Sequence, residues 1–348
     1  MEYKEEFRKL ATIQIVEELR PIPDADRIEL ATIKGWNVIV KKGEFNVGDT
    51  CIYCEIDSVL PAREPFLFLQ EKHFRIKSQK FRGCISQGIC FPLTRDVLVG
   101  TEDVTATPML YKVGDDVTDI MGVTKYEPTI PANLAGQVKG NFPAFAVKTD
   151  EARVQSFPEY LETYKDVPFY VTQKIDGSSI TIYLLDGVLG VCSRNMELYE
   201  TEGNAYWNAV RDLKVEEKLR ENGITDIVLQ GELHGPGIQK NKDALKKVTI
   251  SFFNAYDPKT GRHYDYQEFV DVVAKLGLNT VPVIATNFKL LPTIAEMLAF
   301  AEGKSVLNPQ AEREGLVFRP MVTMRDEFSG HRLSFKVISN KYLLKNED

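Results

Sequence analysis

The sequence has 348 residues, of which 43% are hydrophobic and 27% are charged, and its formal net charge is -7 at pH 7. This length favours two domains over a single core, and this composition supplies enough apolar surface to exclude bulk disorder. The negative net charge argues against a nucleic-acid partner unless Lys and Arg gather in a local patch.

The first residues, MEYKEEFRKLATIQIVEELR, are charged and lack the apolar run of a secretory signal. No stretch of the sequence reaches the roughly 20 apolar residues of a membrane-spanning helix. The five cysteines are too few and too scattered for a disulfide framework, which fits a reducing compartment. We therefore expect a soluble protein of the cytoplasm or another intracellular compartment.

Short β segments dominate the first 125 residues. Their positions are 11–16, 27–33, 37–41, 50–56 and 87–91. Turn-forming residues separate them, including Pro-Asp-Ala-Asp at 23–26 and Asn-Val-Gly-Asp at 46–49. Several short strands at such close spacing predict a small β-barrel, which we assign to a first domain at residues 1–125.

The segment DADRIELATIKGWNVIVKKGEFNVGD resembles the opening strands of OB-fold domains, and the resemblance covers about residues 10–61. Such barrels bind nucleic acid with basic and aromatic side chains. The segment EKHFRIKSQKFRG at 71–83 has this character. Its basic and aromatic members are Lys72, Phe74, Arg75, Lys77, Lys80, Phe81 and Arg82. The pattern indicates either a nucleic-acid contact or an ordinary solvated loop rich in lysine.

Cys51 and Cys54 form a Cys-x-x-Cys motif, which together with Cys84 and Cys90 has the ligands of a four-thiolate zinc site. The motif lies within an apparent strand, TCIYCEI, where residues three apart face opposite sides. We therefore expect these cysteines to be buried in the barrel core rather than bound to zinc.

A stretch with several Pro and Gly residues at 127–145 predicts a linker or irregular connection. Helical patterns then occur at 203–221, 264–276 and 293–302, and a capping box from Thr293 to Glu296 opens the last one. Apolar runs typical of strands lie between the helices. The second domain, residues 126–348, is therefore predicted to be α+β.

Residues 171–195 begin with a Lys-x-Asp-Gly string, from Lys174 to Gly177. Two β-rich runs follow around an Asp186-Gly187 pair, which predicts a β-hairpin. The Lys-x-Asp-Gly string by itself is a weak signal, because so short a pattern arises by chance in many chains.

Further strings follow it in order. They are SRN at 193–195, LQGEL at 229–233, FFNAYD at 252–257, EGLVFR at 314–319 and SFKVI at 334–338. Together they resemble the covalent nucleotidyltransferase superfamily of ATP-dependent ligases and capping enzymes, over about residues 145–345. The resemblance implies a catalytic domain with antiparallel sheets.

In this superfamily a lysine attacks the α-phosphorus of ATP, so the resemblance implies that Lys174 becomes a lysyl-AMP. The amine must be neutral to attack, and we expect its pKa to be lowered by burial and by nearby cations or metal. Asp176 and Gly177 would shape the turn that presents the lysine. Backbone contacts near Gln173 would add specificity for adenine.

The resemblance assigns the remaining site residues to the nucleotide and to magnesium. Arg194 would contact the sugar or the reacting phosphate, and Phe253 would stack on adenine. Glu232 and Glu314 would hold Mg²⁺ or Mn²⁺, mainly through its waters. Lys336 would neutralise the same phosphate. Arg153, about twenty residues before the nucleophile, lies in a segment that resembles one found in some RNA ligases.

One position departs from the pattern of the superfamily. Many relatives end with Lys-x-Lys, whereas Ile338 stands in the second place after Lys336. Whether Lys341 compensates stays open. Taken singly, each of these residues is also compatible with a solvated strand edge or a packed core, and the ordered set favours a functional role.

The order of modules distinguishes the members of the superfamily. DNA ligases and capping enzymes usually carry an OB domain after the last motif, but only about a dozen residues follow Lys336 here. The barrel instead precedes the catalytic half, which resembles one branch of RNA ligases that seal duplex nicks with a 3′-hydroxyl RNA end. The zinc and helix-hairpin-helix modules of NAD-dependent ligases are not seen, so ATP is the expected cofactor.

The sequence therefore predicts an ATP-dependent RNA ligase for RNA repair, acting as a monomer on nicked duplex RNA or an RNA-containing duplex. Three alternatives are an ATP-dependent DNA ligase, a GTP-using capping enzyme and a nonenzymatic RNA-binding protein with a decayed site.

Overall fold

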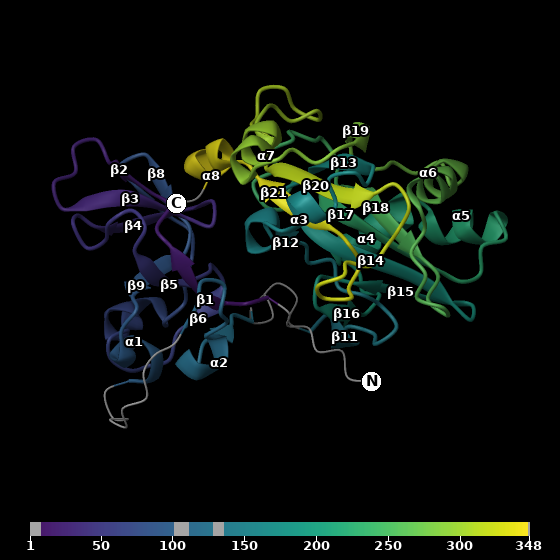
Figure 1. The fold of residues 1–348 in the computed structure, drawn as a ribbon. Coiled ribbons are helices and arrows are strands. Elements are labelled where there is room, and N and C mark those ends of the chain that lie inside the picture. The colour runs from purple at the N-terminus through teal and green to yellow at the C-terminus, as the bar shows by residue number, and fades with distance from the viewer. Residues whose placement is uncertain (1–7, 101–110, 128–135, 347–348) are drawn as a thin grey trace. The chain divides into compact units, whose positions relative to one another are not determined.

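The computed structural model describes residues 8–100, 111–127 and 136–346 of the chain, which form two compact units (Figure 1). The first unit holds the described residues before 130, together with Gln155–Pro158 and the residues from Leu343 onward. The second unit holds the others, up to Tyr342. The sequence-based boundary between residues 125 and 126 stays a prediction. No helix in the described part of the chain is both long and apolar enough to cross a membrane.

The first unit is built mainly from short antiparallel strands. In chain order its elements are β1 (Ala11–Ile15), β2 (Glu18–Pro21), β3 (Ile28–Ile33), β4 (Trp36–Lys41), β5 (Thr50–Cys54), β6 (Ser58–Val59), η1 (Leu67–Lys72), β7 (Gln79–Phe81), β8 (Cys84–Ser86), β9 (Ile89–Pro92), α1 (Arg95–Val99), α2 (Thr118–Met121) and β10 (Thr124–Lys125). The larger sheets have the orders β1-β5-β9 and β2-β3-β4. The five predicted strands are confirmed, while the shorter elements were not predicted.

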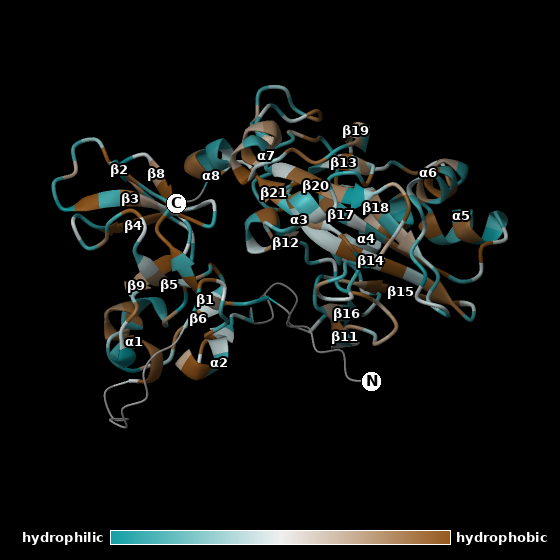
Figure 2. Cartoon of the chain, in the orientation of Figure 1, coloured by the Kyte–Doolittle hydropathy of each residue, from teal (hydrophilic) through white to brown (hydrophobic). Residues whose placement is uncertain are grey.

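One hydrophobic core joins these sheets. Along β4 the side chains alternate, so Trp36, Val38 and Val40 are buried while their neighbours are only half-buried or exposed. Figure 2 shows hydrophobic residues on the strands of both units. Cys51 and Cys54 both belong to this core, as expected. Burial raises the pKa of the Cys54 thiol, and the neighbouring Cys51 adds a smaller contribution in the same direction.

The second unit contains two sheets. The six-stranded sheet has the order β11-β16-β15-β14-β17-β18 and the five-stranded sheet has the order β12-β21-β20-β13-β19. The strands of the first sheet are β11 (Val138–Asn141), β14 (Ser178–Leu185), β15 (Val188–Cys192), β16 (Met196–Leu198), β17 (Ile227–His234) and β18 (Thr249–Tyr256). Those of the second are β12 (Ala152–Arg153), β13 (Phe169–Lys174), β19 (Val283–Phe288), β20 (Gly315–Pro320) and β21 (Phe335–Ile338). Every pairing is antiparallel except that of β12 with β21.

The predicted helices are present, with one interruption. The helices and helical turns of this half are η3 (Val154–Ser156), α3 (Tyr160–Thr163), α4 (Ala205–Asp212), α5 (Val215–Glu221), α6 (Tyr266–Lys275), α7 (Ile294–Ala301) and α8 (Asn340–Asn346). The pattern predicted at 203–221 breaks into α4 and α5, because Lys214 adopts a left-handed φ of 54°. The capping box that opens α7 is confirmed, since Thr293 and Glu296 each cap the other's backbone.

Two local predictions have different outcomes. The Asp186-Gly187 hairpin is confirmed, because both residues have positive φ, 49° and 79°, as a tight turn between β14 and β15 requires. The linker predicted at 127–145 is wrong in part. Within it, β11 pairs with β16 at the edge of the six-stranded sheet, where Val138 packs against the apolar core. Residues 128–135 of that stretch lie outside the described part of the chain.

Candidate active site

The Lys-x-Asp-Gly string lies where the chain passes from one sheet to the other. Lys174 is the last residue of β13 in the five-stranded sheet, and Ser178 is the first residue of β14 in the six-stranded sheet. The three residues between them form a short crossing. Side chains of both sheets can therefore reach Lys174.

Gly177 allows this crossing to approach the six-stranded sheet closely. A Cβ atom at this position would lie 2.4 Å from the backbone oxygen of Leu233 and 2.8 Å from Cγ of Glu232. No larger residue fits without a shift of backbone. The N–H of Gly177 also donates to the carboxylate of Glu232, which brings β17 and its glutamate close to Lys174.

Lys174 is paired with Glu314. The register of β13 and β20 places Lys174 opposite Gly315, so Glu314, one residue earlier, reaches the ammonium, and Lys174 Nζ donates to Glu314 Oε2 at 2.9 Å. Burial lowers the pKa of Lys174, but the carboxylates of Glu314, Glu232 and Asp176 outweigh it, so that the pKa is raised. In the ligand-free site three carboxylates surround the amine and raise its pKa, so the lowering expected from nearby cations or metal stays a prediction.

Glu232 has an unusual protonation equilibrium. Burial raises the pKa of this carboxyl to about 8, with the charge of Glu314 adding to the effect and Lys174 opposing it. Two partly buried carboxylates that share one lysine suit an additional cation. In the described part of the chain no three His, Cys, Asp or Glu side chains form a metal site by themselves. Glu232 and Glu314 therefore fit a magnesium-type ion that takes its remaining ligands from water or phosphate.

Lys336 and Arg153 supply positive charge to the same site. The parallel pairing of β12 with β21 places Arg153 opposite Lys336. Burial, together with the charges of Lys174 and Arg153, lowers the pKa of Lys336 to about 8. The structure thus brings Arg153, predicted from the segment before Lys174, together with the lysine of the last motif.

Asp176 has two partners that sequence reasoning missed. Its Oδ2 atom lies 2.8 Å from Lys242 Nζ and accepts a hydrogen bond of 2.6 Å from Tyr342 Oη. Burial alone would raise the pKa of Asp176, but these two contacts lower it below the ordinary value. Lys242 lies in the polar loop between β17 and β18, where no motif marks it.

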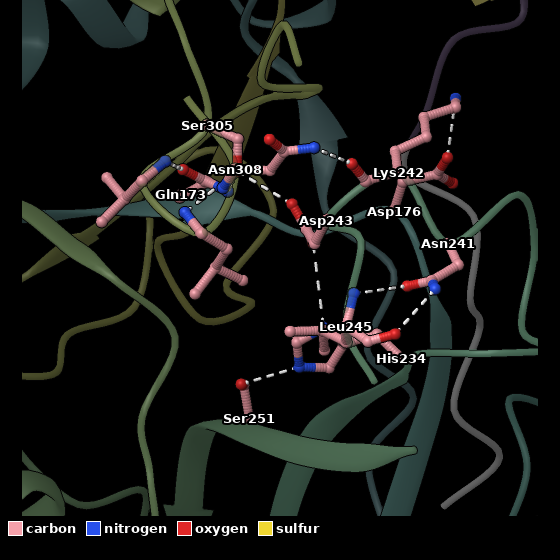
Figure 3. Close-up of polar contacts among 12 residues, drawn as sticks. Gln173, Asp176, His234, Asn241, Lys242, Asp243, Leu245, Ser251, Ser305 and Asn308 are labelled. Carbon is pink, nitrogen blue, oxygen red and sulfur yellow. Dashed lines mark hydrogen bonds and ion pairs between the residues drawn. The ribbon is translucent and has the colours of Figure 1, made fainter. Parts of the chain in front are cut away.

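Gln173 is fully buried and holds a loop with its side chain (Figure 3). Its Nε2 atom donates to Ser305 Oγ at 2.8 Å, and its Oε1 atom accepts from the backbone N–H of Val306 at 2.7 Å. Its own backbone N–H donates to the oxygen of Pro282. The predicted backbone contacts to adenine near Gln173 stay a prediction.

Phe253 lies on β18 of the six-stranded sheet, and Arg194 lies between β15 and β16 of the same sheet. The Phe253 ring is half-buried, with the guanidinium carbon of Arg319 5.3 Å from its centroid, which leaves part of the ring accessible for stacking. Arg194 is exposed and donates to both carboxylate oxygens of Asp150, at 2.7 and 2.9 Å. Their roles toward adenine and phosphate stay predictions.

Lys341 does not pair with the carboxylates around Lys174. Its Nζ atom lies 2.6 Å from Glu302 Oε2, and its side chain is 63% exposed. Ile338 itself is buried. The structure therefore gives no support to Lys341 as the second cation of the last motif.

The basic segment at 71–83 belongs to the first unit, and most of its charge faces solvent. The exposed members are Lys72, Lys77, Lys80, Phe81 and Arg82. Arg75 instead binds Asp57 at 2.8 Å and lies over the ring of Tyr126, while the half-buried Phe74 packs against the core. The segment thus combines a core anchor with an exposed basic and aromatic surface.

Two family models match the chain. One described as an OB-fold domain matches residues 10–93, and one described as RNA ligase matches residues 167–338. The first match confirms the OB-fold of the first unit and extends it beyond residue 61. No curated protein matches.

Solved structures of a Naegleria gruberi RNA ligase are similar to the whole chain. The complex with PPi is 38% identical, with a TM-score of 0.78, and covers 98% of this chain and 99% of its own. A mutant with AMP and Mn is 38% identical, with a TM-score of 0.79 and the same coverage. Another mutant, with ATP and Mn, is 37% identical, with a TM-score of 0.79, and covers 97% of this chain and 99% of its own.

Proposed function

The chain belongs to the RNA ligase family, and we propose that it seals nicks between a 3′-hydroxyl and a 5′-phosphate in duplex RNA by way of AMP bound covalently to Lys174. One observation carries the proposal. Lys174 lies at the crossing between two sheets, within electrostatic reach of two glutamates and of Lys336. The solved structures of the Naegleria gruberi RNA ligase with AMP and Mn and with ATP and Mn support ATP and a divalent cation as the cofactors.

The first step transfers AMP from ATP to the enzyme. The amine of Lys174 loses a proton and attacks the α-phosphorus, so that an N–P bond forms, the bond to the β-phosphate oxygen breaks and pyrophosphate leaves. Because Glu314 keeps the ligand-free amine charged, its deprotonation has to accompany the arrival of substrate. When bound at Glu232 and Glu314, Mg²⁺ or Mn²⁺ supplies the charge that offsets these carboxylates and the phosphate.

The cationic side chains have a separate task in this step. Lys336 and Arg153 bring two positive charges next to Lys174. Charge accumulates on the α-phosphate as the nucleophile approaches, and fixed cations offset it at little cost in reorganisation.

The next two steps use the same centre. AMP passes from Lys174 to the 5′-phosphate of the nick, and the 3′-hydroxyl then attacks that activated phosphate while AMP leaves. We assign binding of the duplex in part to the exposed surface of segment 71–83. Its lysine and arginine side chains can bind the phosphate backbone, and its exposed phenylalanine can stack on unpaired bases. A monomer would be sufficient for all three steps.

The decisive experiment is incubation with α-labelled ATP and Mg²⁺, followed by a denaturing gel. Wild type should carry label, Lys174→Ala should carry none, and Lys165→Ala, an exposed lysine paired with Glu162, should match wild type. Label on Lys174→Ala would refute the nucleophile, and label from GTP instead of ATP would point to capping chemistry. Nicks with RNA or DNA on the 3′-hydroxyl side then separate RNA ligation from DNA ligation.

A further inference from the structure

The residues on either side of Lys174 are held by side chains that come from outside the two sheets. Successive residues of a strand face opposite sides, so the Gln173 side chain points away from the face on which Lys174 meets Glu314. Asp176 follows Lys174 by two residues, in the crossing between β13 and β14. Contacts to Gln173 and to Asp176 therefore fix the end of β13 from two different directions.

The contact to Gln173 comes from Asp243 by way of Ser305 (Figure 3). Ser305 Oγ donates to Asp243 Oδ1 at 2.8 Å and accepts from Gln173 Nε2 at 2.8 Å. Gln173 and Ser305 are buried, and the Asp243 side chain is only 11% exposed. Because water cannot readily replace the partners of buried polar groups, this series of hydrogen bonds fixes Gln173 relative to Asp243.

The contact to Asp176 comes from Lys242, which precedes Asp243 directly in the sequence. Lys242 Nζ lies 2.8 Å from Asp176 Oδ2, and 18% of the lysine side chain is exposed. Lys242 Nζ also donates to Tyr342 Oη, which itself donates to the same Asp176 oxygen at 2.6 Å. Two adjacent residues of one loop therefore reach both sides of Lys174 in the sequence.

The backbone around Lys242 and Asp243 forms a closed turn. Asn241 Nδ2 donates to the oxygen of Leu245 at 3.0 Å, and the N–H of Leu245 donates to Asn241 Oδ1 at 3.1 Å. Asn241 and Ala244, which flank the pair, have φ values of 43° and 52°, in the left-handed region that alanine rarely adopts. Such conformations persist only where the surroundings enforce them, so the turn has a fixed shape.

Contacts on two sides fix this turn relative to the sheets (Figure 3). Asn308 Nδ2 donates to the backbone oxygen of Lys242 at 2.7 Å. On the other side, His234 at the end of β17 places its Nδ1 atom 3.7 Å from Asp243 Oδ2. The turn thus lies between the six-stranded sheet and the segment that also contacts Gln173.

We propose that Lys242 and Asp243 are positioning residues for the transfer of AMP to Lys174. Asp243 fixes Gln173 through Ser305, and Lys242 fixes Asp176, so that the end of β13 presents the amine in one direction. The inference rests on the proposed function. Because the reaction tolerates only small errors in the placement of the attacking atom, a displacement of about 1 Å would slow it by roughly 100-fold.

The three steps of the proposed cycle depend on this placement to different extents. A bond to Lys174 forms in the first step and breaks in the second. In the third step a 3′-hydroxyl attacks a 5′-phosphate that already carries AMP, and no bond to Lys174 changes. Loss of the positioning contacts should therefore slow the first step and spare the third.

The test compares these two steps in the full chain. Lys242→Met removes one contact, and Asp243→Leu and Ser305→Ala each remove the other, whereas Asp243→Asn keeps an oxygen that accepts from Ser305. Lys246→Met, at an exposed lysine of the same loop, is the control. The first step is measured as single-turnover labelling across a range of α-labelled ATP concentrations, and the third as sealing of a nick whose 5′ end is already adenylylated.

Lys242→Met, Asp243→Leu and Ser305→Ala should each lower the first-step rate constant at saturating ATP by roughly 10- to 100-fold. Their sealing of the adenylylated nick should stay close to the wild-type rate, which also shows that they fold. Asp243→Asn should lose much less than Asp243→Leu, and Lys246→Met should match wild type.

Several outcomes would overturn the inference. An equal loss in both steps would mean that the loop supports the fold in general, and a higher ATP requirement with an unchanged rate constant would mean that it binds ATP. An unchanged first step, or equal losses in Asp243→Asn and Asp243→Leu, would also contradict it. If wild type accepted no label from ATP, the proposed function itself would fail, so the two failures are distinguishable.

Discussion

Lys174 Nζ and Glu314 Oε2 are 2.9 Å apart, although 140 positions separate the two residues in the sequence. The pair holds the ammonium in place but also keeps it protonated. In the proposed mechanism the carboxylate turns from the lysine toward a cation when ATP arrives, and its negative charge serves both tasks.

We predict that Glu314→Gln lowers the rate of lysine adenylylation by roughly 100-fold or more, the usual loss when a fixed electrostatic group is removed from an active site. The amide has nearly the same shape, so folding should be retained. The measurement is single-turnover labelling with ATP at saturating Mg²⁺, with circular dichroism as the folding control. Wild-type rates in this variant would show that the carboxylate plays no part in the step.

Gly177→Ala should remove activity for a purely steric reason. The new methyl would meet the backbone oxygen of Leu233 at 2.4 Å, and backbone cannot move away as a flexible side chain can. We expect a loss of about 1–3 kcal/mol in the free energy of unfolding and a large loss of adenylylation. Gly140→Ala is the matched control, because a Cβ there meets nothing within 4 Å. Equal behaviour of both variants in urea unfolding and labelling would contradict this account.

Much of the site could be predicted from the sequence because its residues belong to short motifs on strands that pair with one another. Lys174, Glu232, Glu314 and Lys336 each lie in or beside a strand, and antiparallel pairing of neighbouring strands brings these positions together. The side chains therefore converge without any long loop.

Lys242 and Tyr342 could not be found in this way. Each contacts Asp176 from outside the sheets, one from an irregular loop and the other from the start of α8. Their contacts with Asp176 depend on the tertiary packing of those segments, which the periodicity of the local sequence does not predict. The raised pKa of Lys174 was missed for a related reason, since it is the sum of charges from three separate strands and turns.

His263 makes the fold sensitive to acid. Burial first, and then the charges of Arg332, Arg319 and Arg325, lower the pKa of His263 to about 3. In the unfolded chain histidine titrates near 6.5, so between that pH and pH 3 the unfolded state binds more protons, and stability falls as the pH falls. This group should remove about 2 kcal/mol from the free energy of unfolding between pH 7 and pH 5.

The check on His263 is urea unfolding at pH 7 and at pH 5 for wild type and His263→Gln. The glutamine cannot take up a proton, so the variant should lose less stability than wild type over this interval, whatever its stability at pH 7. An equal loss in both proteins would mean that other groups cause the acid sensitivity. His331→Gln, at an exposed histidine, is the control and should behave as wild type does.

The exposed surface of segment 71–83 should act on the duplex and not on ATP. Reversing the charge of Lys77, Lys80 and Arg82 to Glu should weaken sealing of nicked RNA while leaving lysine adenylylation unchanged, because these side chains belong to the first unit and Lys174 to the second. Loss of three phosphate contacts should also lower the slope of log affinity against log salt by roughly 2 to 3. Lys112→Glu, at an exposed lysine of the same unit, is the control. If the slope of log affinity against log salt were unaltered in duplex-binding measurements, the segment would be an ordinary solvated loop with no contact to the duplex.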